Sequence, residues 1–443
     1  MPPSSRTGTP SSKTGSEPIH KILIEEFERR YLELFWKFQR EQWEHYACDA
    51  HHNVSAIDNE IFDLVVSFKD RIKIFDRRSE VISAVITREL VDRHPEVTRL
   101  RNCLDDEEYN YGHGLSTEDP AYRLTLARRM KPDVLALMQA RNRLSRGLQF
   151  PSYVSLVLST EGLEYQSLFG LLERYLRDNL EKAREVAGTY QISLTPQWFS
   201  NTHAIGHVAQ DLRSLQIIPL FLERLGLDHI RDKVSVYLKE AGFGYDGVLS
   251  PDDIRIMICG FDDLHSWITV FHELGHATAH ALNEESGIFR TWTNVYNETM
   301  AEVFEPIAVY MFLDEANQSA FRELKVLENT RHALSARFEL ELWEHPEAAE
   351  RLYVKHFSQL DVEMGDPEMW VLDSFRYSDP VYIHNYVIGH QIATQTFQFL
   401  RKEFGDDFPN WGEWLKSNYY ADGRKRTLQE KAACSRMGSD IGI

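Results

Sequence analysis

The pentapeptide HELGH, residues 272–276, holds two histidines and a glutamate at a spacing that can bind a metal ion and activate water. On a helix, His272 and His276 lie one turn apart with both rings on one face, so both can ligate one tetrahedral ion. A zinc ion held this way lowers the pKa of a bound water towards 7, and Glu273 is placed to accept its proton. Histidines that merely pair with carboxylates are the alternative. This alternative is less favoured, because the flanking segments WITVF and ATAHAL are apolar and would bury the site, where polar side chains are costly.

A catalytic zinc site normally has a third protein ligand. His280 is eight residues from His272, a helix rise of about 12 Å, so it is a packing residue or an outer neighbour of the site. The segment NVYNETMAEVFEPIAVY, 294–310, carries Glu298, Glu302 and Glu305 at helical spacing in an apolar stretch. Buried carboxylates are costly unless they ligate or accept hydrogen bonds. We therefore expect Glu298 to be the third ligand and Glu302 to accept a hydrogen bond from a ligand histidine; an exposed glutamate stripe is the alternative.

The elements that position these residues are predicted to be mostly helices. Apolar residues step by three and four after Pro18, which predicts a helix to about Tyr46, and the same pattern predicts one over 164–188 ending at Gly188. No proline lies between Pro18 and Pro95, which favours long helices. The segment VSVYLKEA, 234–241, also reads as helical. One strand is predicted over DIRIMIC, 253–259, where isoleucines alternate with other residues.

The 443 residues are enough for a large core and a deep cleft. Residues 1–17, rich in Ser, Thr, Pro and Gly, are expected to form a disordered tail. We expect a helical lobe over 18–200 that forms one wall of the cleft and a zinc-binding catalytic lobe over 201–443. The two lobes are expected to form one cooperative catalytic unit.

Composition excludes several classes of partner. Lys plus Arg number 49 and Asp plus Glu 68, a net charge of −19, so nucleic acid and anionic membranes are poor partners. No segment approaches 18 uninterrupted apolar residues, and no signal peptide is apparent. The four cysteines lie far apart with no CxxC pair, as in a reducing compartment, so a cytoplasmic location is expected.

Three blocks of sequence resemble the gluzincin metallopeptidases, which include angiotensin-converting enzyme, the thimet-type oligopeptidases and the bacterial oligoendopeptidases. DIRIMICGFDDLHSWITVFHELGH is similar to their segment in which an edge strand precedes HExxH, which implies that Ile256 and Ile258 dock the substrate. NETMAEVFE resembles the third-ligand helix, with Glu298 on the ligand position. DPVYIHNYVIG resembles the tyrosine motif, which implies that Tyr386 donates to the oxyanion and that Tyr382 lies nearer the substrate.

The resemblance implies a mainly α, two-lobed helical zincin-like peptidase with a deep central cleft and a small antiparallel edge-strand element next to the HExxH helix. This sequence departs from the family pattern at two places. A histidine usually stands ten residues before the tyrosine, where this chain has Arg376. His384 is a possible substitute, and Arg376 could itself pair with a substrate carboxylate. A lysine that grips the substrate's terminal carboxylate in angiotensin-converting enzyme is replaced by Ser374, so dipeptide release is not implied.

These observations predict one Zn²⁺ per chain and hydrolysis of amide bonds in short peptides within an enclosed channel. A dedicated amidase acting on one modified amide or small metabolite is the alternative, and Arg376 favours it. A binding protein that retains a zinc site without turnover is a third possibility. His203 and His207 repeat the four-residue spacing without an adjacent glutamate, so they are read as loop or core histidines. The oligomeric state is not predicted.

Overall fold

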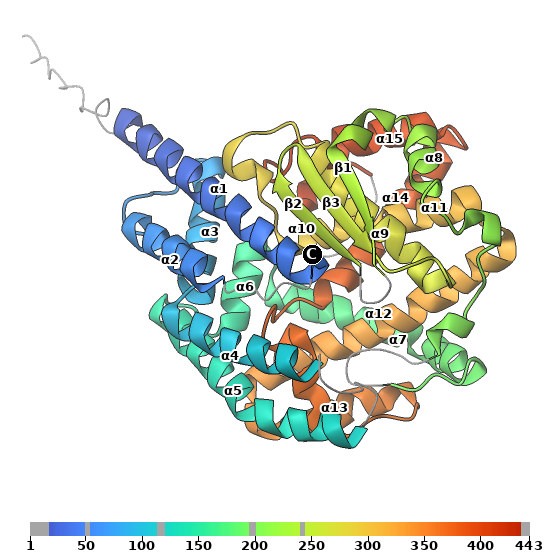
Figure 1. Cartoon of the computed structure of the whole chain (residues 1–443), viewed down its shortest axis with the longest axis horizontal. Helices are drawn as coiled ribbons and strands as arrows, with labels where there is room; N and C mark the ends of the chain where they lie inside the picture. Colours follow the sequence, from blue (N-terminus) through green and yellow to red (C-terminus); the bar gives the residue numbers. More distant parts are fainter. Residues whose placement is uncertain (1–16, 49–53, 113–119, 195–200, 240–243, 436–443) are drawn as a thin grey trace, which may run out of the picture.

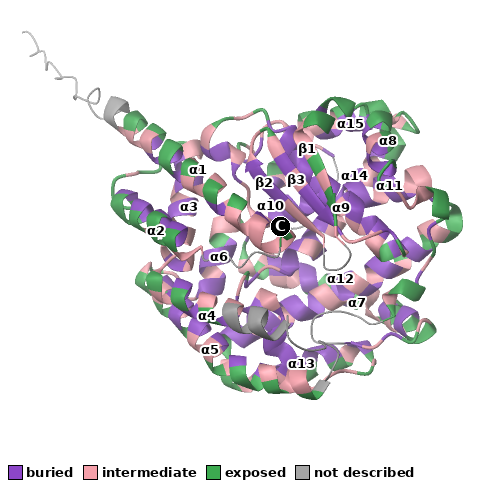
Figure 2. Ribbon diagram, viewed as in Figure 1, coloured by how far each residue is buried: buried purple, intermediate pink, exposed green. Residues whose placement is uncertain are grey.

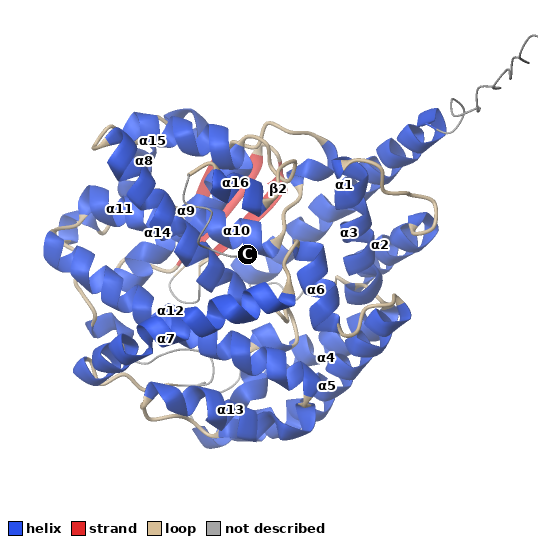
Figure 3. Ribbon diagram, turned by 180° about the vertical axis from the view of Figure 1, so that it is seen from behind, coloured by secondary structure: helices blue, strands red, loops and turns tan. Residues whose placement is uncertain are grey.

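The computed structural model describes residues 17–48, 54–112, 120–194, 201–239 and 244–435, and these are mostly helical (Figures 1 and 3). The predicted tail lies outside the described residues except for Glu17, where the first helix begins. No helix in these ranges is long and apolar enough to cross a membrane.

The helices before the sheet are α1 (Glu17–Cys48), α2 (Ser55–Phe68), α3 (Arg77–Asp92), α4 (Pro95–Gly112), α5 (Pro120–Gly147), α6 (Tyr153–Glu161), α7 (Tyr165–Thr189) and α8 (Ile217–Arg224). The strands are β1 (Val234–Leu238), β2 (Tyr245–Ser250) and β3 (Asp253–Ile258). The helices after the sheet are α9 (Leu264–Ala281), α10 (Asn294–Glu302), α11 (Phe304–Phe312), α12 (Glu315–Glu344), α13 (Ala349–Phe357), α14 (His384–Phe404), α15 (Phe408–Leu415) and α16 (Leu428–Ala433).

The predicted helices are confirmed where periodicity was strong, and their ends differ where capping decides. α1 covers the predicted span, and α7 covers the predicted 164–188 helix but passes through Gly188 to Thr189. The long stretch without proline is divided after Phe68 although no glycine interrupts it. Asp76 starts α3 there: its side chain accepts from the Ser79 backbone N–H, and the Ser79 hydroxyl accepts in return from the Asp76 backbone N–H.

The sheet has the order β1-β3-β2, so β3 is its central strand. β3 runs parallel to β1, with Ile254 opposite Val234, and antiparallel to β2, with Ile254 opposite Val248. The predicted strand is therefore confirmed, but its place at an edge is wrong and the sheet is mixed rather than antiparallel. The helical reading of 234–241 is also wrong for Val234–Leu238, which forms β1 because valines alternate there with Ser235 and Tyr237.

The HELGH motif lies in the middle of α9, which packs against β3 and β2 (Figure 1). Asp263 fixes the start of α9 by accepting from the Ser266 backbone N–H, and the Ser266 hydroxyl accepts in return from the Asp263 backbone N–H. α9 meets β2 partly through polar side chains, since His280 Nε2 lies 3.9 Å from Asp246 Oδ2. Figure 2 shows that β2 and β3 are largely buried.

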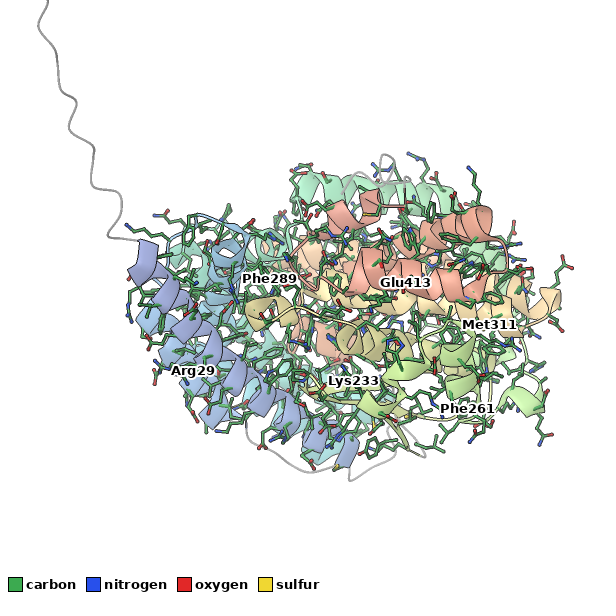
Figure 4. All side chains as sticks on the ribbon, turned by 90° about the horizontal axis from the view of Figure 1, so that it is seen from above. Arg29, Lys233, Phe261, Phe289, Met311 and Glu413 are labelled. Carbon is green, nitrogen blue, oxygen red and sulfur yellow. The ribbon has the colours of Figure 1, made fainter. Side chains whose placement is uncertain are left out.

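One large apolar core joins the two predicted lobes, because it contains residues from Val91 to Ala432. A second core unites α1, α2 and α3 with Ile288 and Phe289. Figure 4 shows Arg29 of α1 and Met311 of α11 at opposite sides of the molecule, with Lys233, just before β1, between them. The division at residue 200 and the central cleft remain predictions.

Candidate active site

His272, His276 and Glu298 come together in the structure. The His272 Nε2 atom lies 3.2 Å from Glu298 Oε2, and the His276 Nε2 atom lies 3.9 Å from Glu298 Oε1. The two imidazole rings are 4.9 Å apart between centroids. One potential ligand atom from each of the three side chains lies within 4.8 Å of the other two, so the group could hold a metal ion.

Two glycines allow α10 to bring Glu298 to the histidines. Gly275, between the two histidines of α9, faces the α10 backbone so closely that a Cβ there would lie 2.7 Å from the Ala301 Cα. On the other side of α10, a Cβ on Gly389 of α14 would lie 3.2 Å from the Thr299 Cα. α10 is thus held between α9 and α14 at distances that larger residues would not permit. The Tyr382 hydroxyl donates to Glu298 Oε1 and fixes this carboxylate.

The electrostatics of the group suit a cation. Burial lowers the pKa of His276 to about 4, so this ring is neutral at pH 7. Burial also acts to lower the pKa of His272, but contacts with Glu298 and Glu305 outweigh it and hold the pKa well above its usual value. Burial would raise the pKa of Glu298, yet His272, His276 and Tyr382 together lower it. Metal-free, the group therefore carries a proton on His272 that a dication would displace.

The carboxylate that orients His272 is Glu305, and the prediction that Glu302 does so is wrong. The His272 Nδ1 atom is 2.9 Å from Glu305 Oε1. Glu302 instead accepts from Lys325 Nζ at 3.1 Å. The same ammonium group lies 2.8 Å from Glu305 Oε2, so Lys325 of α12 joins the two carboxylates behind the histidine. All of these side chains except His272 are buried.

Glu273, the predicted base, takes no part in this network of hydrogen bonds and ion pairs. Its carboxylate has no hydrogen bond or ion pair with another described residue. It passes close to Gly244, where a Cβ would lie 2.5 Å from Glu273 Oε1. Burial and the nearby Asp246 and Glu298 carboxylates raise the pKa of Glu273 well above its usual value, although His272 opposes them. A cation at the His272 group would favour the charged form that a base requires.

Tyr386 lies beside the same group, with its ring 6.2 Å from that of His272 and 5.8 Å from that of Tyr382. No described residue hydrogen-bonds its hydroxyl. Burial, reinforced by Glu298 and Glu273, raises the pKa of Tyr386 well above its usual value, so the hydroxyl stays protonated and able to donate. Tyr382 also lies at the site, where its hydroxyl donates to Glu298, and its contact with substrate remains a prediction.

Arg376 does not serve the predicted role. It is buried, and its guanidinium lies 3.0 Å from Glu339 and 3.0 Å from Asp373, with a further hydrogen bond to Ser335. The prediction that it pairs with a substrate carboxylate is therefore wrong, because two internal carboxylates already neutralise it.

The predicted contacts of His384, Ile256 and Ile258 with substrate also fail. His384 is 2% exposed, and burial, with Arg88 nearby, lowers its pKa to about 3. Ile256 and Ile258 are 0% and 1% exposed on the central strand, so neither can dock a peptide. The edge positions of the sheet belong to β1 and β2.

The remaining histidines of the sequence analysis lie apart from the group. His280 donates from Nε2 to Asn297 Oδ1 at 3.1 Å, and its ring centroid lies 4.3 Å from that of Trp292, which fits a packing residue. His203 and His207 are exposed and belong to none of the metal-compatible groups found among the described residues.

Four residues near the site were not singled out from the sequence as site residues: Glu305, Lys325, Asp246 and His332. Asp246 of β2 forms, with Glu273 and His276, a second group whose ligand atoms lie within 4.8 Å of one another. Burial raises the pKa of Asp246 to about 6. The sequence contains one indication of the direction of Glu305. Pro306 follows it and has no N–H to donate to the Glu302 carbonyl, so the helix is interrupted between the two glutamates. The others depend on contacts between distant segments and left no local signal.

The side chains fit a zinc ion. Two imidazole nitrogens and one carboxylate oxygen are the donor set of many catalytic zinc sites, and a carboxylate hydrogen-bonded to a ligand histidine is their usual support. The geometry around His272, His276 and Glu298 supplies both. With Glu273 and Tyr386 unpaired beside it, the arrangement can activate water and stabilise negative charge.

The chain shares its fold with solved metallopeptidase structures. The sequence matches no protein-family model, and no curated protein has a significantly matching sequence. The M32 carboxypeptidase of Deinococcus radiodurans is 13% identical with a TM-score of 0.69, over 95% of this chain and 97% of that one. Trypanosoma cruzi metallocarboxypeptidase 1 is 15% identical with a TM-score of 0.67, over 94% and 95%. A putative oligoendopeptidase F is 13% identical with a TM-score of 0.64, over 97% and 91%. The predicted resemblance to helical zincin-like peptidases is thereby confirmed at the level of the fold.

Proposed function

We propose that this protein is a zinc metallopeptidase that hydrolyses amide bonds in short peptides. The observation that carries the proposal is the convergence of His272, His276 and Glu298 next to the unpaired side chains of Glu273 and Tyr386. The structures of similar fold bear the names of carboxypeptidases and an oligoendopeptidase, which supports a peptide as substrate.

Each residue has a separate task in the proposed reaction. Zinc, when bound by His272, His276 and Glu298, would polarise water and the scissile carbonyl. Glu273 takes a proton from the attacking water and passes it to the leaving nitrogen. The Tyr386 hydroxyl donates to the oxygen on which negative charge develops. Glu305 holds the His272 ring in one orientation through the Nδ1 atom.

A general peptidase is favoured over the dedicated amidase. The amidase alternative depended on Arg376 as a recognition group for an unusual substrate. Because Arg376 is buried between Glu339 and Asp373, that support is gone.

The proposal is tested by metal analysis of the purified protein together with mass spectrometry of a mixed peptide library before and after incubation. We expect one zinc per chain and cleavage of several short peptides, lost on treatment with a chelator. The Glu273→Gln variant should keep its zinc and lose about 10²- to 10⁴-fold in kcat, because its amide cannot accept the proton.

Three results would contradict the proposal. If the zinc-loaded protein cleaves none of the peptides, the protein is a binding protein with a retained zinc site. Cleavage that survives Glu273→Gln would remove the proposed base. Protein that takes up no zinc would remove the metal site itself.

A further inference from the structure

His332 of α12 is an imidazole without a partner beside the proposed active site. Its ring lies 4.9 Å from that of Tyr386, with the two planes 30° apart. No hydrogen bond or ion pair joins either ring nitrogen to another described residue. Nδ1 is fully buried, whereas the residue as a whole remains partly accessible. Nε2 is not among the fully buried atoms, so it is the ring nitrogen that a ligand can reach. Unpaired polar groups in a protein interior are costly, which favours a hydrogen bond from this nitrogen to a bound substrate.

The imidazole is neutral under physiological conditions. Burial lowers the pKa of His332 well below its usual value, and the positive charges of Arg331 and Lys325 lower it further, against the opposing effect of Glu302. A neutral imidazole carries one N–H donor and one acceptor nitrogen. Such a group suits an uncharged peptide better than a carboxylate, which Arg or Lys would bind more strongly.

The position of His332 indicates which part of a substrate it meets. Tyr386 contacts the rings of both His272 and His332, whereas those two histidine rings make no contact with each other among the described ring pairs. His332 is thus one side chain further from the metal group than Tyr386. An extended peptide advances about 3.3 Å per residue, so the 4.9 Å between the Tyr386 and His332 rings exceeds one such step. A donor there reaches the next peptide group rather than the scissile one.

We propose that His332 is a substrate-binding residue that donates a hydrogen bond to the carbonyl of the peptide group adjoining the scissile bond. This inference rests on the proposed peptidase function and narrows its substrate class. The substrates are peptides with at least one further peptide group next to the bond that is cut, and isolated amides are poor substrates. Sequence reasoning did not find His332, because its proximity to Tyr386 joins two helices 54 residues apart.

The test uses two variants that separate packing from hydrogen bonding. His332→Phe keeps a ring against Tyr386 and removes both nitrogens, whereas His332→Gln removes the ring and keeps a donor. His356→Phe is the matched control, since His356 is a buried histidine that contacts Glu341 away from the site. Each variant is assayed on a peptide that the wild type hydrolyses. It is also assayed on two analogues in which the peptide group on one side or the other of the scissile bond is replaced by a trans-alkene.

We expect His332→Phe to lose about tenfold in kcat/KM on the parent peptide and to match the wild type on one of the two alkene analogues, which lacks the carbonyl that His332 binds. His332→Gln should retain part of the activity, and His356→Phe all of it. A loss that is equal on all three substrates, or no loss, overturns the inference while the peptidase function stands. A wild type that hydrolyses no peptide overturns both. If His332→Phe does not fold, the same substrate comparison with His332→Gln decides, because structural damage cannot distinguish the analogues.

Discussion

The two sides of the metal-compatible group differ in how their polar side chains are satisfied. Behind His272, Glu305 contacts both the imidazole and Lys325, and Lys325 also binds Glu302. The ion pairs continue through Glu328, which lies 3.8 Å from Lys325. Every charge on this side has an opposite charge beside it.

The front of the group is different. Glu273, Tyr386 and His332 have no hydrogen-bond partner among the described residues. Glu273 is buried, whereas Tyr386 and His332 are partly exposed. The paired side neutralises its charges within the protein and so fixes the positions of the ligands. The unpaired side leaves donors and acceptors to be completed by a substrate, which stabilises a bound transition state more than the free enzyme. Substitutions on the two sides should therefore affect different measurements.

The largest effect on stability is expected from Arg376, which belongs with the paired residues. Arg376→Met leaves Glu339 and Asp373 buried without their cation. Breaking a buried ion pair by removing one partner costs about 3 to 5 kcal/mol, so the free energy of unfolding from denaturant titration should fall by that amount. The kcat/KM of the protein that remains folded should change little.

Arg376→Lys serves as the control, since it keeps the charge and should recover part of the stability. If Arg376→Met instead has the free energy of unfolding of the wild type and a raised KM for peptides with a free carboxylate, Arg376 binds substrate.

Tyr386 tests the unpaired side. Tyr386→Phe removes a hydroxyl that no described residue binds, so the free energy of unfolding should be nearly unchanged. Loss of one donor to an oxyanion typically raises the barrier by about 2.7 to 4 kcal/mol, so kcat should fall on the order of 10²- to 10³-fold with little change in KM. Tyr420→Phe is matched to it, because the Tyr420 hydroxyl also has no hydrogen-bond partner among the described residues but lies on the π-helical turn Lys416–Tyr420. Equal activity in the two variants would exclude Tyr386 from the reaction.

The sequence predicted those parts of the site that depend on the spacing of residues within a single segment. His272 and His276 share a helix face because four residues make about one turn, and the strand before them follows from alternating isoleucines. Glu298 was found because a carboxylate in an apolar helix needs a reason to be there. These are properties of single segments, and the structure confirms the segments and their convergence.

The errors arise where a neighbour from a distant segment decides. β3 is central because Val234–Leu238 pairs with its free side, and nothing in 253–259 specifies how many partners that strand has. Glu302 and Glu305 lie on either side of the break between α10 and α11, which changes the direction in which each points. Arg376 looked like a binding residue because Glu339, which neutralises it, is 37 residues away. Long-range pairing of this kind cannot be read from local periodicity.

A smaller effect on stability is expected at Gly275, whose contact with α10 positions Glu298. Gly275→Ala puts a methyl group 2.7 Å from the Ala301 Cα and 2.8 Å from its carbonyl oxygen, so α9 and α10 have to separate. Forcing an extra methyl into a packed interior typically costs about 1 to 3 kcal/mol, and zinc affinity should fall with it because Glu298 moves away. Gly188→Ala is the matched control on α7, where a Cβ meets nothing within 4 Å. That substitution should be neutral or stabilise the helix by up to about 1 kcal/mol. Gly275→Ala protein with wild-type stability and zinc affinity would show that the close approach is not needed.

The smallest effect concerns the pH dependence of metal binding. In the metal-free protein the pKa of His272 is well above its usual value despite burial, because Glu298 and Glu305 contact the ring. The His276 ring is already neutral, since burial lowers its pKa to about 4. Zinc therefore displaces the proton of His272 at a pH below the pKa of His272 and above that of His276, and any proton on Glu273 is released as well. Affinity should rise about tenfold, or about 1.4 kcal/mol, per pH unit for each proton displaced, and the contribution of His272 should level off above its pKa. Competition with a chelator of known affinity at several pH values measures this slope.

Glu305→Gln removes a carboxylate that raises the pKa of His272, so the plateau should begin at a lower pH. A wild-type slope of zero near pH 7 would mean that His272 is already neutral before the metal arrives.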